Sequence, residues 1–212
     1  MKKPVDFYLK NKTNLEKEAS ILKKKLINLG IFRFVVFLVT CFLIYLTLGN
    51  YPDVFIIAFL GILFFSFLVT KFINLKREKA IVDAKIAIHK TEIKVLNRDF
   101  HHLENGTEFV NPAHFYSNDI DLFGIGSFFQ YINRTSTIDG KAALANVFTE
   151  NKTDGIIEKQ HAINELSKKV KWRHHFSALA NLVTVKNKTA FISEWIINYK
   201  SVFPKFLSTL QI

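Results

Sequence analysis

The sequence of 212 residues contains one cysteine, Cys41. A single thiol cannot form an internal disulfide, and it cannot supply the several thiolates of a structural zinc site. Cys41 also lies inside an apolar run, where a thiol usually packs as a small hydrophobic group. We therefore expect no redox chemistry. The length allows one domain with an appendage, or two small domains.

Charge is nearly absent between Arg33 and Lys71, where Asp53 is the only ionised side chain. Ten of the 22 phenylalanines lie between Phe32 and Phe72. Two apolar runs, 34–48 and 54–70, flank a turn-forming cluster at 49–53, and with their neighbours each reaches about 18–20 residues, enough to span a bilayer. Both lack the polar face expected of a core helix in a small globular protein. Residues 31–73 are therefore predicted to form a two-helix transmembrane hairpin.

The net charge of +11 is distributed unevenly. Residues 1–33 carry nine basic and three acidic side chains, and residues 71–99 carry eight and four. Residues 100–212 carry twelve and ten, so their net charge is only +2. Because basic residues flank transmembrane segments on the cytoplasmic side, we predict that both termini are cytoplasmic and that the turn faces outward. The small charge of residues 100–212 argues against direct DNA binding there.

Apolar residues recur at spacings of three and four on both sides of the hairpin. This periodicity predicts an amphipathic helix over residues 1–30 and a longer one over 74–104, which pair and extend the hairpin. His89 falls in the second stripe, where we expect a satisfied packing residue. The two stripes consist of Leu15, Ala19, Leu22, Leu26 and Leu29, and of Val82, Ile86, His89, Ile93, Leu96, Phe100 and Leu103.

The break at residues 104–106 begins a third region, 105–212, which is also helical in period. No useful strand alternation appears, so an all-α fold is predicted, with short helices bundled over 117–203. Three apolar stripes are expected to form the faces through which these short helices pack against one another. The stripes are Ile156, Ile163, Leu166 and Val170; Trp172, Phe176, Leu179 and Val183; and Ile192, Trp195, Ile196 and Tyr199.

No nucleotide or metal motif is complete. Gly140-Lys141 matches only the middle of a phosphate loop, because Thr135 stands where glycine is needed and Ala142 where a hydroxyl is needed. The Gly124-Ile125-Gly126 segment lacks the third glycine of a dinucleotide loop. Adjacent histidines, such as those at 101–102 and 174–175, diverge by about 100° on a helix and do not easily share an ion. The sequence thus predicts no catalytic, cofactor-binding or metal-binding residue in this chain.

Three segments carry a recognisable pattern: GSFFQYINRTSTIDGKAALANVF, NKTDGIIEKQHAINEL and KWRHHFSAL. Together they resemble the start of the core domain of MutS-type DNA mismatch-repair ATPases, over roughly residues 95–185. The hairpin before them is similar to that of a membrane-anchored bacterial branch. The residues that match the family's core motif are Arg134, Thr135, Thr137, Gly140, Ile156, Lys159, Gln160, Ala162, Ile163 and Leu166.

The resemblance implies that this region is a structural hub and that ATP and magnesium bind to a domain that follows the core. We accordingly expect an incomplete core in residues 105–212, and a phosphate loop encoded beyond Ile212. It also implies a bacterial cytoplasmic membrane as the location. The candidate partners are the lipid bilayer, a second copy in a homodimer, and DNA bound through other domains.

Two features depart from the family pattern. Mismatch-binding members carry a Phe-x-Glu reader near the N-terminus, where this chain has the hairpin. The letters of the reader occur at 148–150, after the core motif, and we interpret them as coincidental. The alternative hypothesis is a small helical membrane scaffold or partner-docking protein with no nucleotide or DNA role.

Overall fold

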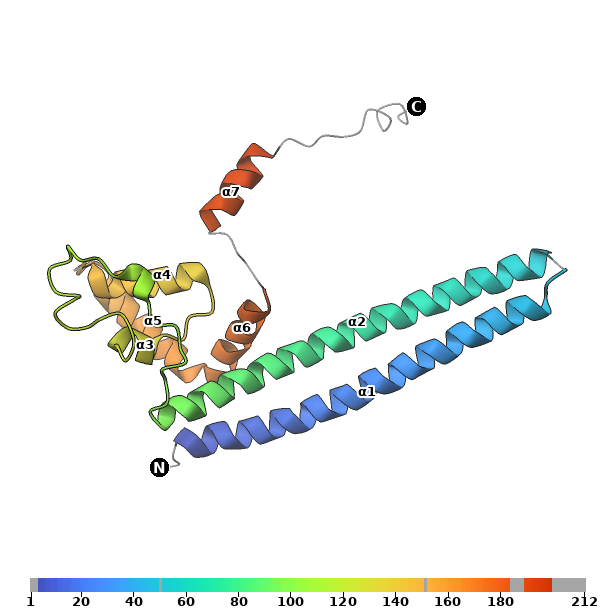
Figure 1. The fold of residues 1–212 in the computed structure, drawn as a ribbon, viewed down its shortest axis with the longest axis horizontal. Helices are drawn as coiled ribbons and strands as arrows, with labels where there is room; N and C mark the ends of the chain where they lie inside the picture. Colours follow the sequence, from blue (N-terminus) through green and yellow to red (C-terminus); the bar gives the residue numbers. More distant parts are fainter. Residues whose placement is uncertain (1–3, 50, 151, 184–188, 200–212) are drawn as a thin grey trace.

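The computed structural model describes residues 4–49, 51–150, 152–183 and 189–199, and these contain helices and turns but no strand (Figure 1). The predicted all-α class is therefore confirmed. The helices are α1 (Pro4–Leu46), α2 (Tyr51–Leu96), the 3₁₀ helix η1 (Thr107–Phe109), α3 (Phe128–Ile132), α4 (Ile138–Thr149), α5 (Ile156–Lys168), α6 (Val170–Leu182) and α7 (Thr189–Asn198).

Helices α1 and α2 form one long antiparallel hairpin, and each runs without a break from an amphipathic part into an apolar part (Figure 1). With 43 and 46 residues, each is about 65–70 Å long at 1.5 Å per residue. The amphipathic parts pack through the predicted stripes. Leu22, Val82 and Ile86 are buried there, with Leu15, Ala19 and Leu75 against them.

The apolar parts of both helices are long and hydrophobic enough to cross a membrane. Only 0% and 6% of their most apolar windows are buried, so the described protein does not cover them. The helices approach closely at Gly61, where an added Cβ would lie 2.5 Å from Thr40 Cγ2. At the polar end of this region, the Arg33 guanidinium lies 4.9 Å from the centre of the Phe72 ring.

Helix α2 ends at Leu96, well before the boundary predicted near residue 104. The chain turns at Arg98, whose φ of 63° is left-handed, and the Asp99 amide donates to the Lys94 carbonyl at 3.0 Å. Left-handed residues commonly end helices in this way, although glycine is usual at that position. Phe100 and Leu103 therefore lie in the following turns and not on the helix.

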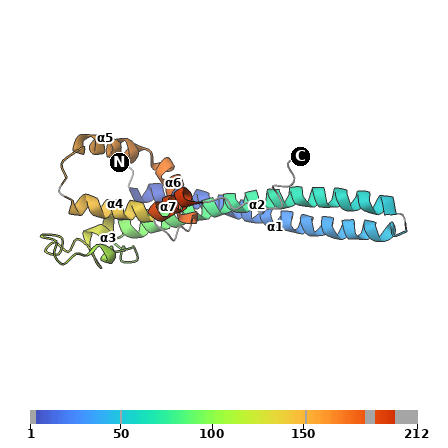
Figure 2. The same cartoon turned by 90° about the horizontal axis from the view of Figure 1, so that it is seen from above.

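Helices α3, α4, α5 and α6 gather beside the end of the hairpin where α1 begins and α2 ends (Figures 1 and 2). Helix α6 packs against α2. It does so through His174 and Ala178, whereas Trp172 and Phe176 of the predicted stripe are 55% and 52% exposed. The face that meets α2 is therefore not the most apolar one, since it consists of the His174 ring packed against His89 and of the fully buried Ala178.

Helix α5 has no buried residue, so its stripe does not form a packed face within the described structure. Trp195 and Ile196 of α7 are exposed, and so is Tyr199, which follows the helix, while the side chain of Ile192 lies outside the described set. The bundle predicted for residues 117–203 is thus formed only in part. Among the described elements, α6 makes the most extensive packing of a short helix against α2, and it buries Ala178.

Candidate functional site at the junction of the hairpin and the short helices

The loop after α2 is joined to α3 by Gln130, whose side chain is only 1% exposed. Its Nε2 donates to the carbonyls of His101 and Leu103 at 3.0 and 2.7 Å. Its Oε1 accepts from the Gly126 amide at 2.8 Å. All these partners are backbone groups, so one side chain fixes the path of two loops. We call the region of residues 97–141, with the facing end of α2, the junction.

The break between α3 and α4 is built largely by local side-chain hydrogen bonds. Asn133 Oδ1 accepts from the amide and hydroxyl of Thr135 at 3.1 and 2.7 Å. Asn133 Nδ2 donates to the Glu104 carbonyl at 3.3 Å. Thr137 caps α4 by accepting from the Gly140 amide at 3.0 Å, a typical N-cap interaction. The helix begins at Ile138, so Gly140 lies in its first turn.

Arg134 connects this break to the hairpin. Its Nε donates to Glu92 Oε1 on α2 at 2.6 Å. Another guanidinium nitrogen donates to the carbonyls of Tyr131 and Asn133 at 3.0 and 2.9 Å. Because the guanidinium is held by both the end of α3 and by α2, it sets the position of one relative to the other.

Lys141, which stands in the incomplete phosphate-loop pattern, is occupied by protein carboxylates. Its ammonium lies 2.7 Å from a Glu104 oxygen and 2.6 Å from a Glu108 oxygen. The Glu104 and Glu108 contacts raise the pKa of Lys141, and the hydrogen bond from Lys141 lowers the pKa of Glu108. The cation therefore fastens the start of α4 to the loop around η1.

An aromatic core supports these polar contacts. Phe129 is fully buried, and its ring centre lies 5.1 Å from that of Phe123 and 5.8 Å from that of Phe109. At the other end of α4, Phe148 packs against Phe128 at 5.6 Å, and its carbonyl accepts from the Tyr116 hydroxyl. The Phe148-Thr149-Glu150 letters therefore form a packed helix end.

Helix α6 meets the hairpin at three rings that pack edge to face or at a tilt. The His89 and His174 ring centres are 4.9 Å apart, and Tyr8 lies 5.6 and 6.0 Å from them. His89 is 5% exposed, and its Nδ1 has no hydrogen-bond partner among the described residues. The prediction that His89 is a packing residue is confirmed, but the prediction that it is satisfied is wrong for this atom, because its neighbours there are rings.

Burial shapes the titration of these three groups. It lowers the pKa of His89. Burial, and next the nearby His89, lower the pKa of His174 to about 4. Burial and then Glu92 raise the pKa of Tyr8. All three shifts favour the neutral forms, so the contact of α6 with the hairpin is an uncharged one near neutral pH.

Acidification is expected to loosen α6. The pKa of His174 is about 4 when α6 is docked and 6.5 in its ordinary state. The undocked form therefore binds more protons between these values, so the stability is present above about pH 6.5 and is lost as the pH falls toward 4. Allowing for partial exposure, we expect docking to weaken by about 1 kcal/mol between pH 7 and 5. Amide hydrogen exchange in α6, corrected for its intrinsic pH dependence, measures this.

His174→Phe should remove most of that pH dependence while keeping a ring in the contact. His161→Phe is the matched control, because His161 is exposed on α5. Equal pH dependence in the parent chain and the His174 variant would contradict this account of the α6 contact.

The structure brings together only part of the sequence motif. Arg134, Thr135, Thr137 and Gly140 all lie in the junction. The α5 members Gln160, Ile163 and Leu166 are exposed, with Ile163 at 68% and Leu166 at 39%. The motif residues in α5 therefore take no part in the hydrogen bonds that Arg134, Thr135, Thr137 and Gly140 form in the junction.

Sequence reasoning missed Gln130, Glu92 and the role of Lys141. A polar residue between Phe129 and Tyr131 is a weak signal of a buried hydrogen-bonding role, but the residues that it bonds cannot be identified from sequence spacing.

Among the described residues, no three His, Cys, Asp or Glu side chains are grouped to hold a metal ion. The hydrogen bonds and ion pairs of the junction connect α2 and the loop after it to α3 and α4. Comparison of the chain with protein-family models, curated proteins and solved structures gives no match.

Proposed function

We propose that this chain anchors a helical domain to a lipid bilayer and holds it in a fixed orientation to the anchor. One observation carries the proposal: α1 and α2 run without interruption from an uncovered apolar segment to the junction, where Glu92 of α2 binds Arg134. An anchor needs the first feature and a fixed orientation needs the second. The apolar parts contain no charged residue suited to an ion pathway.

The proposed membrane is the bacterial cytoplasmic membrane, with both termini in the cytoplasm. The uneven charge supports this orientation, because the basic flanks lie at the same end of the hairpin. Arg33 and Lys71 lie at the boundary, where long basic side chains can extend toward the headgroups.

We further propose that the helical domain is the beginning of a MutS-type core. The resemblance of residues 95–185 supports this, and so does the connecting role of Arg134 and Thr137, since a structural hub is what the resemblance implies. In such a protein ATP and magnesium bind to a domain that follows the core, and DNA binds through other domains. A homodimer is part of the same proposal.

Cysteine labelling tests the anchor and its orientation. Asp53→Cys in a Cys41→Ala background should react with a membrane-impermeant maleimide added to intact spheroplasts, because residue 53 is at the outer turn. Lys17→Cys in the same background is the control and should react only after the membrane is opened. The reverse pattern would overturn the orientation. Absence of the chain from the membrane fraction, with neither site reacting until the spheroplasts are opened, would overturn the anchor.

A second candidate function, a partner-docking scaffold, is favoured by the exposed apolar side chains of α5 and α6, among them Ile157, Ile163 and Trp172. Detection of the cellular protein with an antibody against the helical domain would distinguish the MutS-type proposal from the scaffold. A membrane protein heavier than 24.5 kDa that binds ATP supports the MutS-type proposal. A membrane protein of 24.5 kDa that does not bind ATP supports the scaffold.

A further inference from the structure

We propose that a ring of basic side chains at the edge of the apolar segment binds the headgroups of anionic phospholipids. This inference rests on the proposed membrane anchor and specifies which lipids surround it. We call the ring the collar, and it consists of Lys23, Lys24, Lys25, Lys76 and Arg77.

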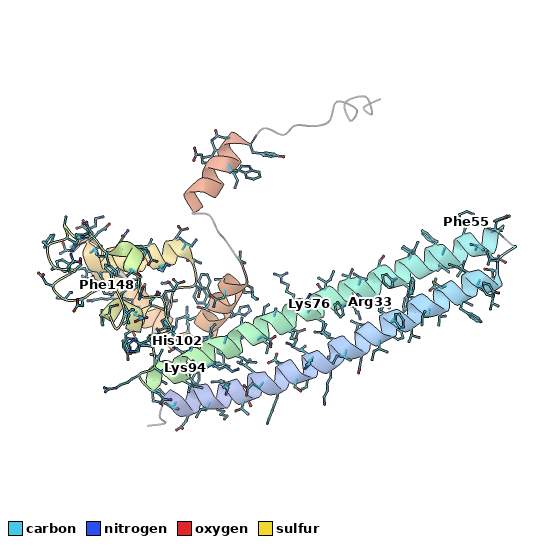
Figure 3. The ribbon with its side chains drawn as sticks, in the orientation of Figure 1. Arg33, Phe55, Lys76, Lys94, His102 and Phe148 are labelled. Carbon is cyan, nitrogen blue, oxygen red and sulfur yellow. The ribbon has the colours of Figure 1, made fainter. Side chains whose placement is uncertain are left out.

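The two halves of the collar lie at one height along the hairpin. Leu22 of α1 is buried in the cluster against which Leu75 of α2 packs. Because the helices are antiparallel, Lys23–Lys25 continue from Leu22 toward the apolar end, whereas Lys76 and Arg77 continue from Leu75 away from it. The two sets are therefore offset by only about 3–8 Å along the hairpin, at 1.5 Å per residue. About 12–15 Å nearer the apolar end along α1, at 1.5 Å per residue, Arg33 lies over the Phe72 ring. Figure 3 shows Arg33 and Lys76 close together along the hairpin, far from Phe55 near the turn.

The positive excess is concentrated at this height. Residues 20–33 and 71–79 together hold eight basic side chains and one acidic side chain, Glu78, a net charge of +7. Farther from the apolar segment, residues 1–19 hold five basic and three acidic side chains, and residues 80–99 hold four and three. A solvated helix face would not need this concentration, whereas a surface that meets anionic headgroups would.

The collar side chains are available for a ligand. All five residues are exposed, and none forms a salt bridge with a described carboxylate. Nearby lysines outside the collar differ, since Lys79 binds Asp83 and Lys12 lies 3.6 Å from Glu16. The strong positive potential of the collar is therefore not cancelled within the described protein.

The shape of the collar fits a membrane plane. Three consecutive lysines on α1 point in directions about 100° apart, so their charges cover an arc of about 200° around the helix instead of one narrow face. Charges spread around a rod at one height match a flat layer that the rod crosses. A protein partner or a nucleic acid would contact one side of the rod.

The distance from the apolar boundary also fits. Lys76 and Arg77 lie about 8–9 Å beyond Lys71, and Lys23–Lys25 lie about 9–12 Å before Ile31, at 1.5 Å per residue. The polar region of a bilayer extends roughly 5–8 Å beyond the hydrocarbon on each side. Long lysine and arginine stems can close the remaining gap by bending toward the headgroups.

The test uses the full chain reconstituted in vesicles that contain phosphatidylglycerol and phosphatidylcholine. Spin-labelled forms of the two lipids report, by electron paramagnetic resonance, how strongly each associates with the protein. We expect the anionic lipid to be favoured on the order of fivefold, the equivalent of one basic contact per lipid, and we expect high salt to reduce this preference.

A collar variant should lose the preference and associate with both lipids equally. Its changes are Lys23→Gln, Lys24→Gln, Lys25→Gln, Lys76→Gln and Arg77→Gln. A matched control variant should keep the preference, since it loses the same charge farther from the apolar segment. Its changes are Lys10→Gln, Lys12→Gln, Lys90→Gln, Lys94→Gln and Arg98→Gln.

Equal association of both lipids with the parent chain would overturn the inference, and so would a preference that the collar variant retains. If the parent chain shows no lipid preference but binds duplex DNA through the collar in neutral vesicles, the partner is a nucleic acid and the inference is wrong. In each case the chain remains in the vesicles after alkaline carbonate. Extraction by carbonate would instead overturn the membrane anchor itself, and the inference with it.

Discussion

Gln130→Leu is expected to lower the free energy of opening of the junction by about 1.5–4 kcal/mol, because three part-buried hydrogen bonds are lost and each contributes about 0.5–1.5 kcal/mol net. Three groups lose their partner: the Gly126 amide and the carbonyls of His101 and Leu103. Leucine fills a similar volume, so the loss reports hydrogen bonding more than packing. Hydrogen exchange of peptides covering residues 122–132, measured on the full chain in detergent, gives the free energy.

Gln160→Leu is the matched control for this prediction. Gln160 belongs to the sequence motif but is exposed on α5, so the same substitution should change stability by less than about 0.5 kcal/mol. Similar losses at both positions would contradict a special role for Gln130. A loss confined to Gln160 would mean that α5 is packed against something the described structure does not contain.

Gly106→Ala is expected to destabilise the junction by about 2–4 kcal/mol, through two separable causes. The φ of Gly106 is +71°, a left-handed conformation that costs a residue with a Cβ about 1 kcal/mol or more. The added Cβ would also lie 2.6 Å from the Phe129 ring and 2.9 Å from the Phe123 ring, and overpacking of a core typically costs 1–3 kcal/mol. Urea unfolding followed by pulse proteolysis of the full chain measures the total.

Gly155→Ala separates the two causes. Its φ of +70° is nearly the same, but the nearest atom to an added Cβ is Glu158 Oε2 at 3.8 Å. This variant should therefore show only the conformational cost of about 1 kcal/mol. Equal destabilisation at both glycines would mean that the aromatic core around Gly106 adjusts freely, contrary to the packing described here.

The long hairpin could be predicted because its signals are local and repeated. Apolar windows and stripes of period 3.6 specify α1 and α2, and the residues buried between them, such as Leu22 and Ile86, are those of the stripes. The end of α2 could not be placed, since Arg98 adopts a left-handed conformation that its residue type does not favour. The loop that follows is held by contacts formed only in the folded chain.

The junction shows the same division between local and distant contacts. Asn133, Thr135 and Thr137 bond within two or three residues, so their turn and cap could be predicted. Arg134 and Glu92 are 42 residues apart, and Gln130 bonds carbonyls 27 and 29 residues away. Residue type alone could not pair them. The choice of His174 and Ala178 over Trp172 as the face of α6 also depends on the surface of α2.

The unbroken course of α1 and α2 makes the hairpin a lever arm. A stiff pair of helices has no hinge at the boundary of its apolar part, so any change in its tilt is carried to the short helices. If the proposed anchor spans a bilayer, about 38 Å of helix lies outside it, and a tilt of about 10° would move the far end by about 6–7 Å. Hydrophobic helices tilt to fit the thickness of their bilayer. The position of the domain above the membrane would therefore depend on the thickness of the lipids that hold the anchor.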